Sequence, residues 1–88
     1  MKRGFKIRDN VYVVFESGGG APEGTIGFSI IDSYEYKVIE KSIWEGIPET
    51  DGEFLDAVAY IAEMYGIEAD NSNGIEEVGY EELEEILV

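Results

Sequence analysis

The stretch from Glu49 to Gly66 reads ETDGEFLDAVAYIAEMYG, and it decides the architecture that we expect for the chain. Its apolar residues recur at three- and four-residue spacing, which predicts an α-helix with one wide apolar side. Thr50 and Glu53 have the spacing of a capping box, in which side chains bond the free amides at the start of a helix. Gly66 is suited to the left-handed conformation that ends a helix. The residues expected to form the apolar side are Phe54, Leu55, Val58, Ala59, Ile61, Ala62 and Tyr65.

Three stretches before this helix have the residue pattern of β-strands. Residues 10–16 are almost continuously apolar, which predicts a central strand that is buried on both faces. Residues 25–32 alternate between apolar and polar side chains, and residues 36–45 carry apolar side chains on both faces. We interpret residues 1–9 as a frayed end or an edge strand, because chain ends are commonly poorly ordered.

After the helix, residues 66–69 are a candidate for a short fourth strand, and residues 70–74 give the strongest turn signal in the chain. Residues 80–88 predict a terminal helix, which Tyr80, Leu83 and Leu87 are expected to dock.

Strands that are joined by short turns pair in antiparallel fashion. We therefore expect one α+β domain over residues 1–88, built on an antiparallel meander of three to four strands. A long amphipathic helix and a short C-terminal helix are expected to pack on one side of this sheet.

Charge sets the chain apart, because 20 acidic residues oppose 6 basic residues and give a net charge of -14. From Glu45 to Val88 there are fourteen acids and no base. Such a chain should repel nucleic acid and anionic lipid, and it should attract cations or basic proteins. No apolar run approaches membrane-spanning length and no signal peptide is visible, so we expect a cytoplasmic protein with no membrane partner.

The chain has no cysteine and no histidine. This composition excludes disulfides, thiol nucleophiles, Ser-His pairs and the usual zinc sites. A resident metal should therefore be a hard ion bound by oxygen, Ca²⁺ or alternatively Mg²⁺. Trp44 and the six tyrosines are expected in the core and not in a ligand pocket.

The acidic turn between residues 68 and 77 is the expected cation site. Calcium loops place oxygen ligands on alternate residues of a tight turn, with a glycine at the bend and a carboxylate further on. Here Gly74 supplies the bend, although the spacing is not that of an EF-hand. The alternative is a plain turn beside solvated glutamates. The residues expected to bind the metal are Glu68, Asp70, Ser72, Glu76 and Glu77.

The small size, the lack of cysteine and the acidic second half with its turn at Asp70 are similar to small archaeal proteins of unknown function that bind calcium. This resemblance implies a calcium site at that turn.

A second, partial resemblance spans most of the chain. The run VYVVFESGG at residues 11–19, Gly27, TDGE at residues 50–53 and DNS at residues 70–72 together resemble the ribonuclease H superfamily. That family uses carboxylates to hold two magnesium ions for phosphodiester hydrolysis. This chain lacks the family's later helices, later strand and last carboxylate. The positions that match are Glu16, Glu53 and Asp70.

Acids and hydroxyls alone give no specific pair of nucleophile and base. We therefore expect a non-enzymatic protein with a weak calcium or magnesium site. The alternative is an acidic protein-interaction module, such as a mimic of nucleic acid, that binds a basic protein. A metal-dependent nuclease ranks third, because the basic residues that hold a phosphate backbone are few.

Overall fold

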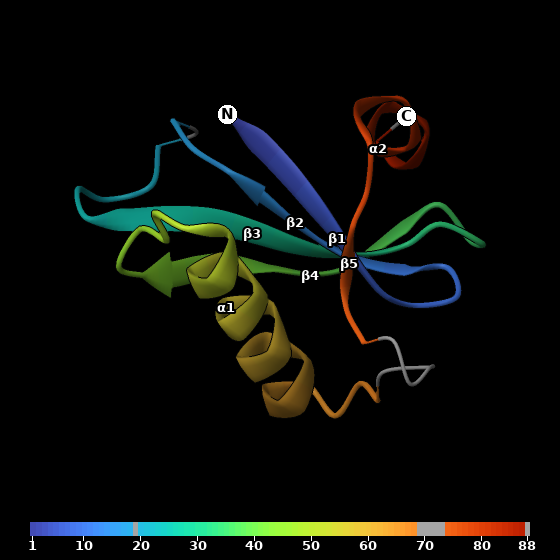
Figure 1. Ribbon diagram of the computed structural model, residues 1–88. Helices are drawn as coiled ribbons and strands as arrows, with labels where there is room; N and C mark the ends of the chain where they lie inside the picture. The colour runs from blue at the N-terminus through green and yellow to red at the C-terminus, as the bar shows by residue number, and fades with distance from the viewer. Residues whose placement is uncertain (19, 69–73, 88) are drawn as a thin grey trace.

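The apolar strand stretches of the sequence form the middle of one antiparallel sheet. The computed structural model describes residues 1–18, 20–68 and 74–87. The strands lie side by side in the order β4-β3-β2-β1-β5 (Figure 1). The elements in chain order are β1 (Lys2–Arg8), β2 (Val11–Glu16), β3 (Thr25–Asp32), β4 (Lys37–Glu45), α1 (Asp51–Met64), β5 (Glu76–Glu77) and α2 (Tyr80–Ile86).

Strand β2 occupies the centre of the sheet, between β1 and β3. The prediction that this strand is buried on both faces is confirmed, since the four consecutive residues Tyr12, Val13, Val14 and Phe15 are all buried. Successive side chains of a strand point to opposite faces, so an unbroken apolar run requires a cover on each side of the sheet.

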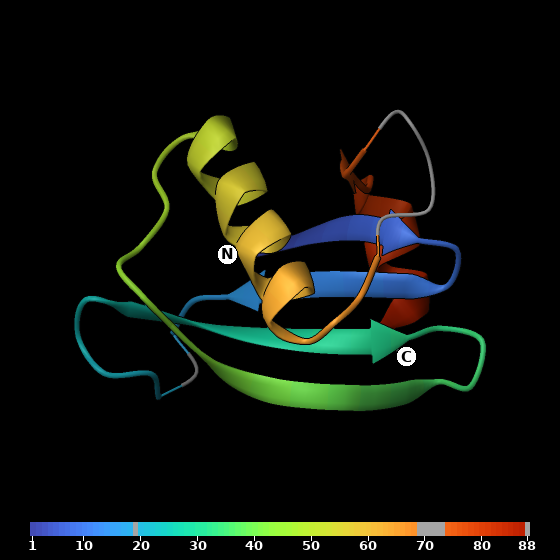
Figure 2. The same ribbon diagram turned by 90° about the horizontal axis from the view of Figure 1, so that it is seen from below.

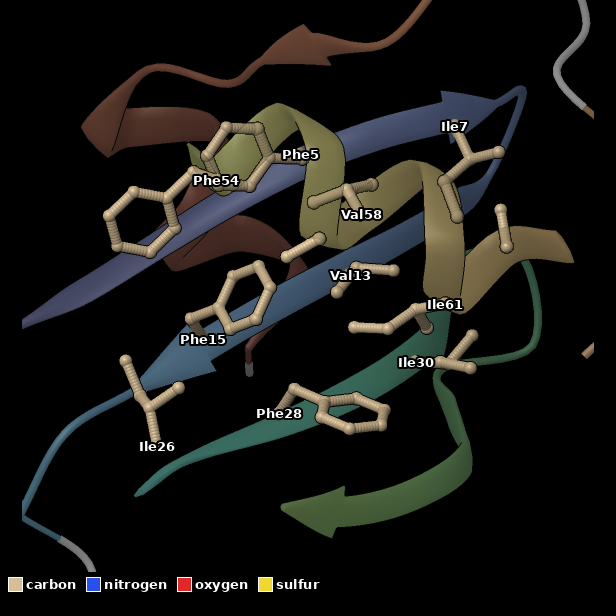
Figure 3. Close-up of a cluster of buried hydrophobic side chains, with 12 residues drawn as sticks. Phe5, Ile7, Val13, Phe15, Ile26, Phe28, Ile30, Phe54, Val58 and Ile61 are labelled. Carbon is tan, nitrogen blue, oxygen red and sulfur yellow. The ribbon is translucent and has the colours of Figure 1, made fainter. Parts of the chain in front are cut away.

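Helix α1 covers the face on which Val13 and Phe15 lie, which we call the α1 face. It begins as predicted, because the Thr50 hydroxyl accepts a hydrogen bond from the Glu53 amide at 3.1 Å. The Glu53 carboxylate reaches back to the amide of Glu49, at 2.8 Å. Figure 3 shows the aromatic and branched side chains that meet beneath the helix. The buried residues of this core are Phe5, Ile7, Val13, Phe15, Ile26, Phe28, Ile30, Phe54, Ala57, Val58, Ile61 and Ala62.

Helix α2 covers the opposite face, which we call the α2 face. Its Leu83 and Ile86 pack against Tyr12, Val14 and Ile31 of the sheet. The two helices accordingly lie on opposite sides of the strands (Figure 1).

Gly4 of β1 allows α2 to lie close to the sheet. A methyl group at Gly4 would lie 2.7 Å from Cδ1 of Leu83 and 3.0 Å from Cγ2 of Val78. The absent side chain therefore sets how closely α2 lies against the sheet.

The expected architecture was wrong in three respects, although the α+β class holds. The sheet has five strands and not three to four. The helices do not share one side, because the double-sided apolar character of β2 leaves the α2 face to be covered as well. Helix α1 has 14 residues, which is an ordinary length and not a long one.

Several local predictions were also wrong. Residues 2–8 form an inner strand, because Phe5 and Ile7 alternate toward the core between basic neighbours. Residues 66–68 form no strand, and residue 69 lies outside the described residues. Tyr80 does not dock α2, since it is 75% exposed, and Leu87 is also exposed.

The prediction that the tyrosines lie in the core was wrong for most of them, since only Tyr12 is buried. Trp44 is partly buried and meets the Tyr60 ring, with 5.5 Å between ring centroids. No helix in the described part of the chain has both the length and the apolar character needed to cross a membrane.

Candidate functional site

Arg3 ties β1 to both β5 and α1. Its Nε and Nη2 donate hydrogen bonds to the two carboxylate oxygens of Glu77 at 2.8 and 2.6 Å. Nη2 also donates to Asp51 at 2.8 Å. The guanidinium carbon lies 4.3 Å from the ring centroid of Phe54 and 5.5 Å from that of Phe5. The hydrogen bond to Glu77 is the largest cause that raises the pKa of Arg3 above its ordinary value. Glu77 therefore has a structural role.

The Arg3–Glu77 pair occupies one of the ligands of the predicted cation site. Asp70 and Ser72 lie outside the described residues. Glu76 stands opposite Lys6 in the β1–β5 pair, and Glu77 is already bound by Arg3. Glu68 is exposed in the loop after α1. Among residues 1–18, 20–68 and 74–87, no three acidic side chains are grouped closely enough to hold a metal ion. The calcium or magnesium site remains a prediction.

Two of the carboxylates matched to the ribonuclease H superfamily, Glu16 and Glu53, lie on different faces of the sheet. Glu16 follows Phe15 at the end of β2 and stands opposite Gly27, so its side chain belongs to the α2 face. Glu53 belongs to the cap of α1, on the other face. Asp70 lies outside the described residues. The structure therefore does not bring the two described carboxylates onto one face.

A different set of side chains surrounds a cleft at one end of the sheet. The cleft has a volume of about 630 Å³ and lies between α2, the β1–β2 turn and the β3–β4 turn. The two turns are held together by the Ser33 amide, which donates to the carbonyl of Asn10 at 2.8 Å. The lining residues are Asn10, Tyr12, Ser33, Tyr34, Tyr36, Glu81, Glu82, Glu85 and Ile86.

The β3–β4 turn presents two tyrosine rings to solvent beside this cleft. The Asp32 carboxylate accepts a hydrogen bond from the Tyr34 amide at 2.9 Å, which fixes the start of the turn. Tyr36 adopts a φ of 53°, in the left-handed region that bulky residues rarely occupy. Tyr34 and Tyr36 are 78% and 73% exposed, so neither ring contributes to the core.

Tyr12 forms the floor of the cleft and bonds to α2. Its hydroxyl donates to Glu82 Oε2 at 2.7 Å. Burial, followed by this hydrogen bond to a carboxylate, raises the pKa of Tyr12 from 10.0 to about 12. The bond occupies Glu82 and joins α2 to the sheet at the cleft.

Glu81 and Glu85 also line the cleft and are exposed. They stand four residues apart on α2, where like charges repel and destabilise a helix. No basic residue lies in the last turn of α2 to offset them. A bound positive group would relieve this repulsion.

Sequence reasoning missed this cleft. The tyrosines were assigned to the core, and no role was identified for the glutamates of residues 80–88. The available signal was the turn-like DSYE at residues 32–35, which places a tyrosine in a turn where it has no strand or helix to pack against.

The comparisons with known proteins give no family to guide the assignment. No protein-family model, curated protein or solved structure matches this chain. Function is therefore inferred from the geometry of the chain itself.

Proposed function

We propose that the protein is an acidic interaction module that binds a lysine- or arginine-rich segment of another protein in the cleft beside α2. One observation carries this proposal: glutamate carboxylates and tyrosine rings line the same hollow. Carboxylates attract ammonium and guanidinium groups, and aromatic faces attract them further through cation–π contacts. Side chains of both kinds suit a basic residue, and neither kind suits an anionic ligand.

Two further features support a basic protein as the partner. The net charge of -14 favours encounter with a cationic partner and opposes encounter with nucleic acid. The cleft also stays open at the surface, beside the exposed rings of Tyr34 and Tyr36. An extended segment can therefore place one basic side chain in the cleft while its backbone remains outside. This function is binding and involves no chemical step.

The test is a titration of the full chain with a short lysine- and arginine-rich peptide, followed by backbone amide shifts. We expect saturable shifts that are centred on Tyr34, Tyr36, Glu81 and Glu85. Because an exposed ion pair contributes roughly 0.5–1 kcal/mol, the double variant Glu81→Gln/Glu85→Gln should weaken binding about tenfold. Added salt should also weaken binding.

Glu63→Gln/Glu84→Gln is the matched control, because it also removes two exposed negative charges and neither residue lines the cleft. The control should bind almost as well as the unmodified chain. A peptide in which glutamine replaces every lysine and arginine should not bind. Equal weakening by the control and the cleft variant, or shifts spread over the whole acidic surface, would show general charge attraction and contradict the proposal.

A further inference from the structure

Strand β4 (Lys37–Glu45) is the long open edge of the sheet. Its nine residues pair with β3 on one side only, whereas β5 at the other edge has two residues. Figure 2 shows that no described element runs alongside the outer edge of β4. An unpaired edge presents a row of free amide and carbonyl groups, which is a template for another strand.

The apolar side chains of β4 are exposed beside this edge. Val38, Ile39 and Ile43 are 54%, 51% and 48% exposed. Val38 stands opposite Ile31 and Ile43 opposite Gly27, which places both on the α2 face of the sheet. A bulge adds Ile39 to the strand between Val38 and Glu40, and strand alternation puts Ile39 on the same face as Ile43. These branched side chains make one apolar edge that α2 does not cover.

The charge of β4 is balanced, unlike that of the chain. After the first eight residues the only basic residues are Lys37 and Lys41, and both lie on β4 with Glu40 and Glu45. The strand therefore carries no net charge in a protein of net charge -14. Two copies of this chain would meet with the least local repulsion along β4.

From this pattern we infer that two copies associate through antiparallel pairing of their β4 strands, around a two-fold axis beside Lys41. In this register Ile39 faces Ile43 of the other copy, and Glu40 faces Ser42 of the other copy. The symmetry repeats each pair twice, so the strand complements itself. Both sheets keep the same faces aligned, and the two five-stranded sheets become one continuous sheet.

A second copy fits this edge better than an unrelated strand does, because its β4 carries no net charge and the two-fold rotation sets Ile39 against Ile43 twice. In the symmetric register the Lys41 residues of the two copies face each other at the two-fold axis. A lysine on an edge strand limits open-ended pairing, and the resulting dimer should be weak. The β4 dimer does not depend on the cleft beside α2. Dimerisation and peptide binding can therefore each fail without the other.

The test is sedimentation equilibrium of the full chain at protein concentrations up to about 1 mM, where a dimer with a millimolar dissociation constant is detected. We expect a monomer–dimer equilibrium that strengthens in added salt, since salt screens the repulsion between two acidic copies. Peptide binding in the cleft should show the opposite salt response.

Charge substitutions at the apolar pair test the register. Ile39→Lys and Ile43→Lys should each abolish the dimer, because each sets a lysine against an isoleucine at two symmetric places. The double variant Ile39→Lys/Ile43→Glu should restore the dimer, because the register sets the two opposite charges against each other. Ile47→Lys is the matched control, since Ile47 is 50% exposed outside β4, and it should not weaken association. The melting temperature of each variant in dilute solution checks that it is folded.

A chain that stays monomeric at all these concentrations and salt levels overturns the inference. So does a dimer that tolerates both Ile39→Lys and Ile43→Lys, because it must use another surface. A basic strand from another protein binding along β4 in place of a second copy would also overturn it.

Discussion

The two faces of the sheet differ in how much apolar surface they bury. Among the described residues, twelve buried side chains gather on the α1 face and five on the α2 face. Helix α1 has 14 residues and a side-chain cap from Thr50. Helix α2 has 7 residues, and its first residue follows Gly79, which makes no side-chain cap. Burial drives folding in proportion to apolar area, so the α1 face should supply most of the stability.

The thinner α2 face also carries the cleft with its carboxylates and tyrosine rings. On the α1 face the rings of Phe5, Phe15 and Phe54 meet one another, and Arg3 closes one side of the cluster. On the α2 face a hydrogen bond between a tyrosine and a carboxylate adds to a few apolar contacts between helix and sheet. A short helix with few apolar anchors leaves its glutamates free at the surface, where a partner can reach them. The α1 face therefore supplies most of the stability, and the α2 face presents the proposed binding site.

The largest expected effect comes from two adjacent isoleucines of β3. Ile30 is fully buried on the α1 face, and Ile31 is 4% exposed on the α2 face. Ile30→Ala should lower the free energy of unfolding by about 4 kcal/mol and Ile31→Ala by about 2 kcal/mol, since the thinner cover collapses more easily around a cavity. Urea unfolding of both variants measures the difference. Equal losses would mean that the two faces contribute alike.

A smaller effect is expected from Tyr12→Phe in alkaline solution. The folded-state pKa of Tyr12 is raised from 10.0 to about 12, so folding favours the protonated phenol. Its contribution, about 1–2 kcal/mol, should be fully present below pH 10 and should disappear as the pH rises through about 12. The difference in stability between the unmodified chain and Tyr12→Phe, measured by urea unfolding across this range, should shrink. A constant difference would contradict the assigned hydrogen bond to Glu82.

The smallest effect is expected from calcium. Glu77 is bound by Arg3, so the predicted ligand set has lost one carboxylate. A site with a millimolar dissociation constant should add less than about 1 kcal/mol to stability in millimolar calcium. Thermal unfolding with sodium chloride of equal ionic strength as the control measures this effect. Stabilisation well above that limit, with amide shifts confined to residues around Glu68, would establish a stronger site than we expect.

The sequence pattern alone was sufficient to predict the elements whose apolar residues recur at regular spacing. The sequence predicts β3 with the bounds that the structure has, and the Thr50 hydroxyl caps α1 as expected. It failed for β1, which was expected to be a frayed end or an edge strand because it lies at a chain end, although Phe5 and Ile7 alternate there with basic residues. Pairing with β2 over most of its length fixes this strand, and such pairing cannot be read from one segment.

The cleft was harder to predict than the fold. It combines a turn residue such as Tyr34 with Glu85 near the end of the chain, and only the docking of α2 brings them together. That docking depends on Gly4, whose missing side chain gives Leu83 its place. In the sequence Gly4 signals only a break in helical pattern, because nothing local indicates which helix will lie against it.

The central claim is that α1 belongs to the stable core while α2 is a separate, thinner cover. Native-state hydrogen exchange of the unmodified chain and Gly4→Ala tests this claim most directly. We predict that α2 amides exchange through an opening of lower free energy than α1 amides. Gly4→Ala should lower the α2 opening energy further while it leaves the amides of the α1 face nearly unchanged. Equal opening energies for the two helices, or equal losses in both on substitution, would contradict the account.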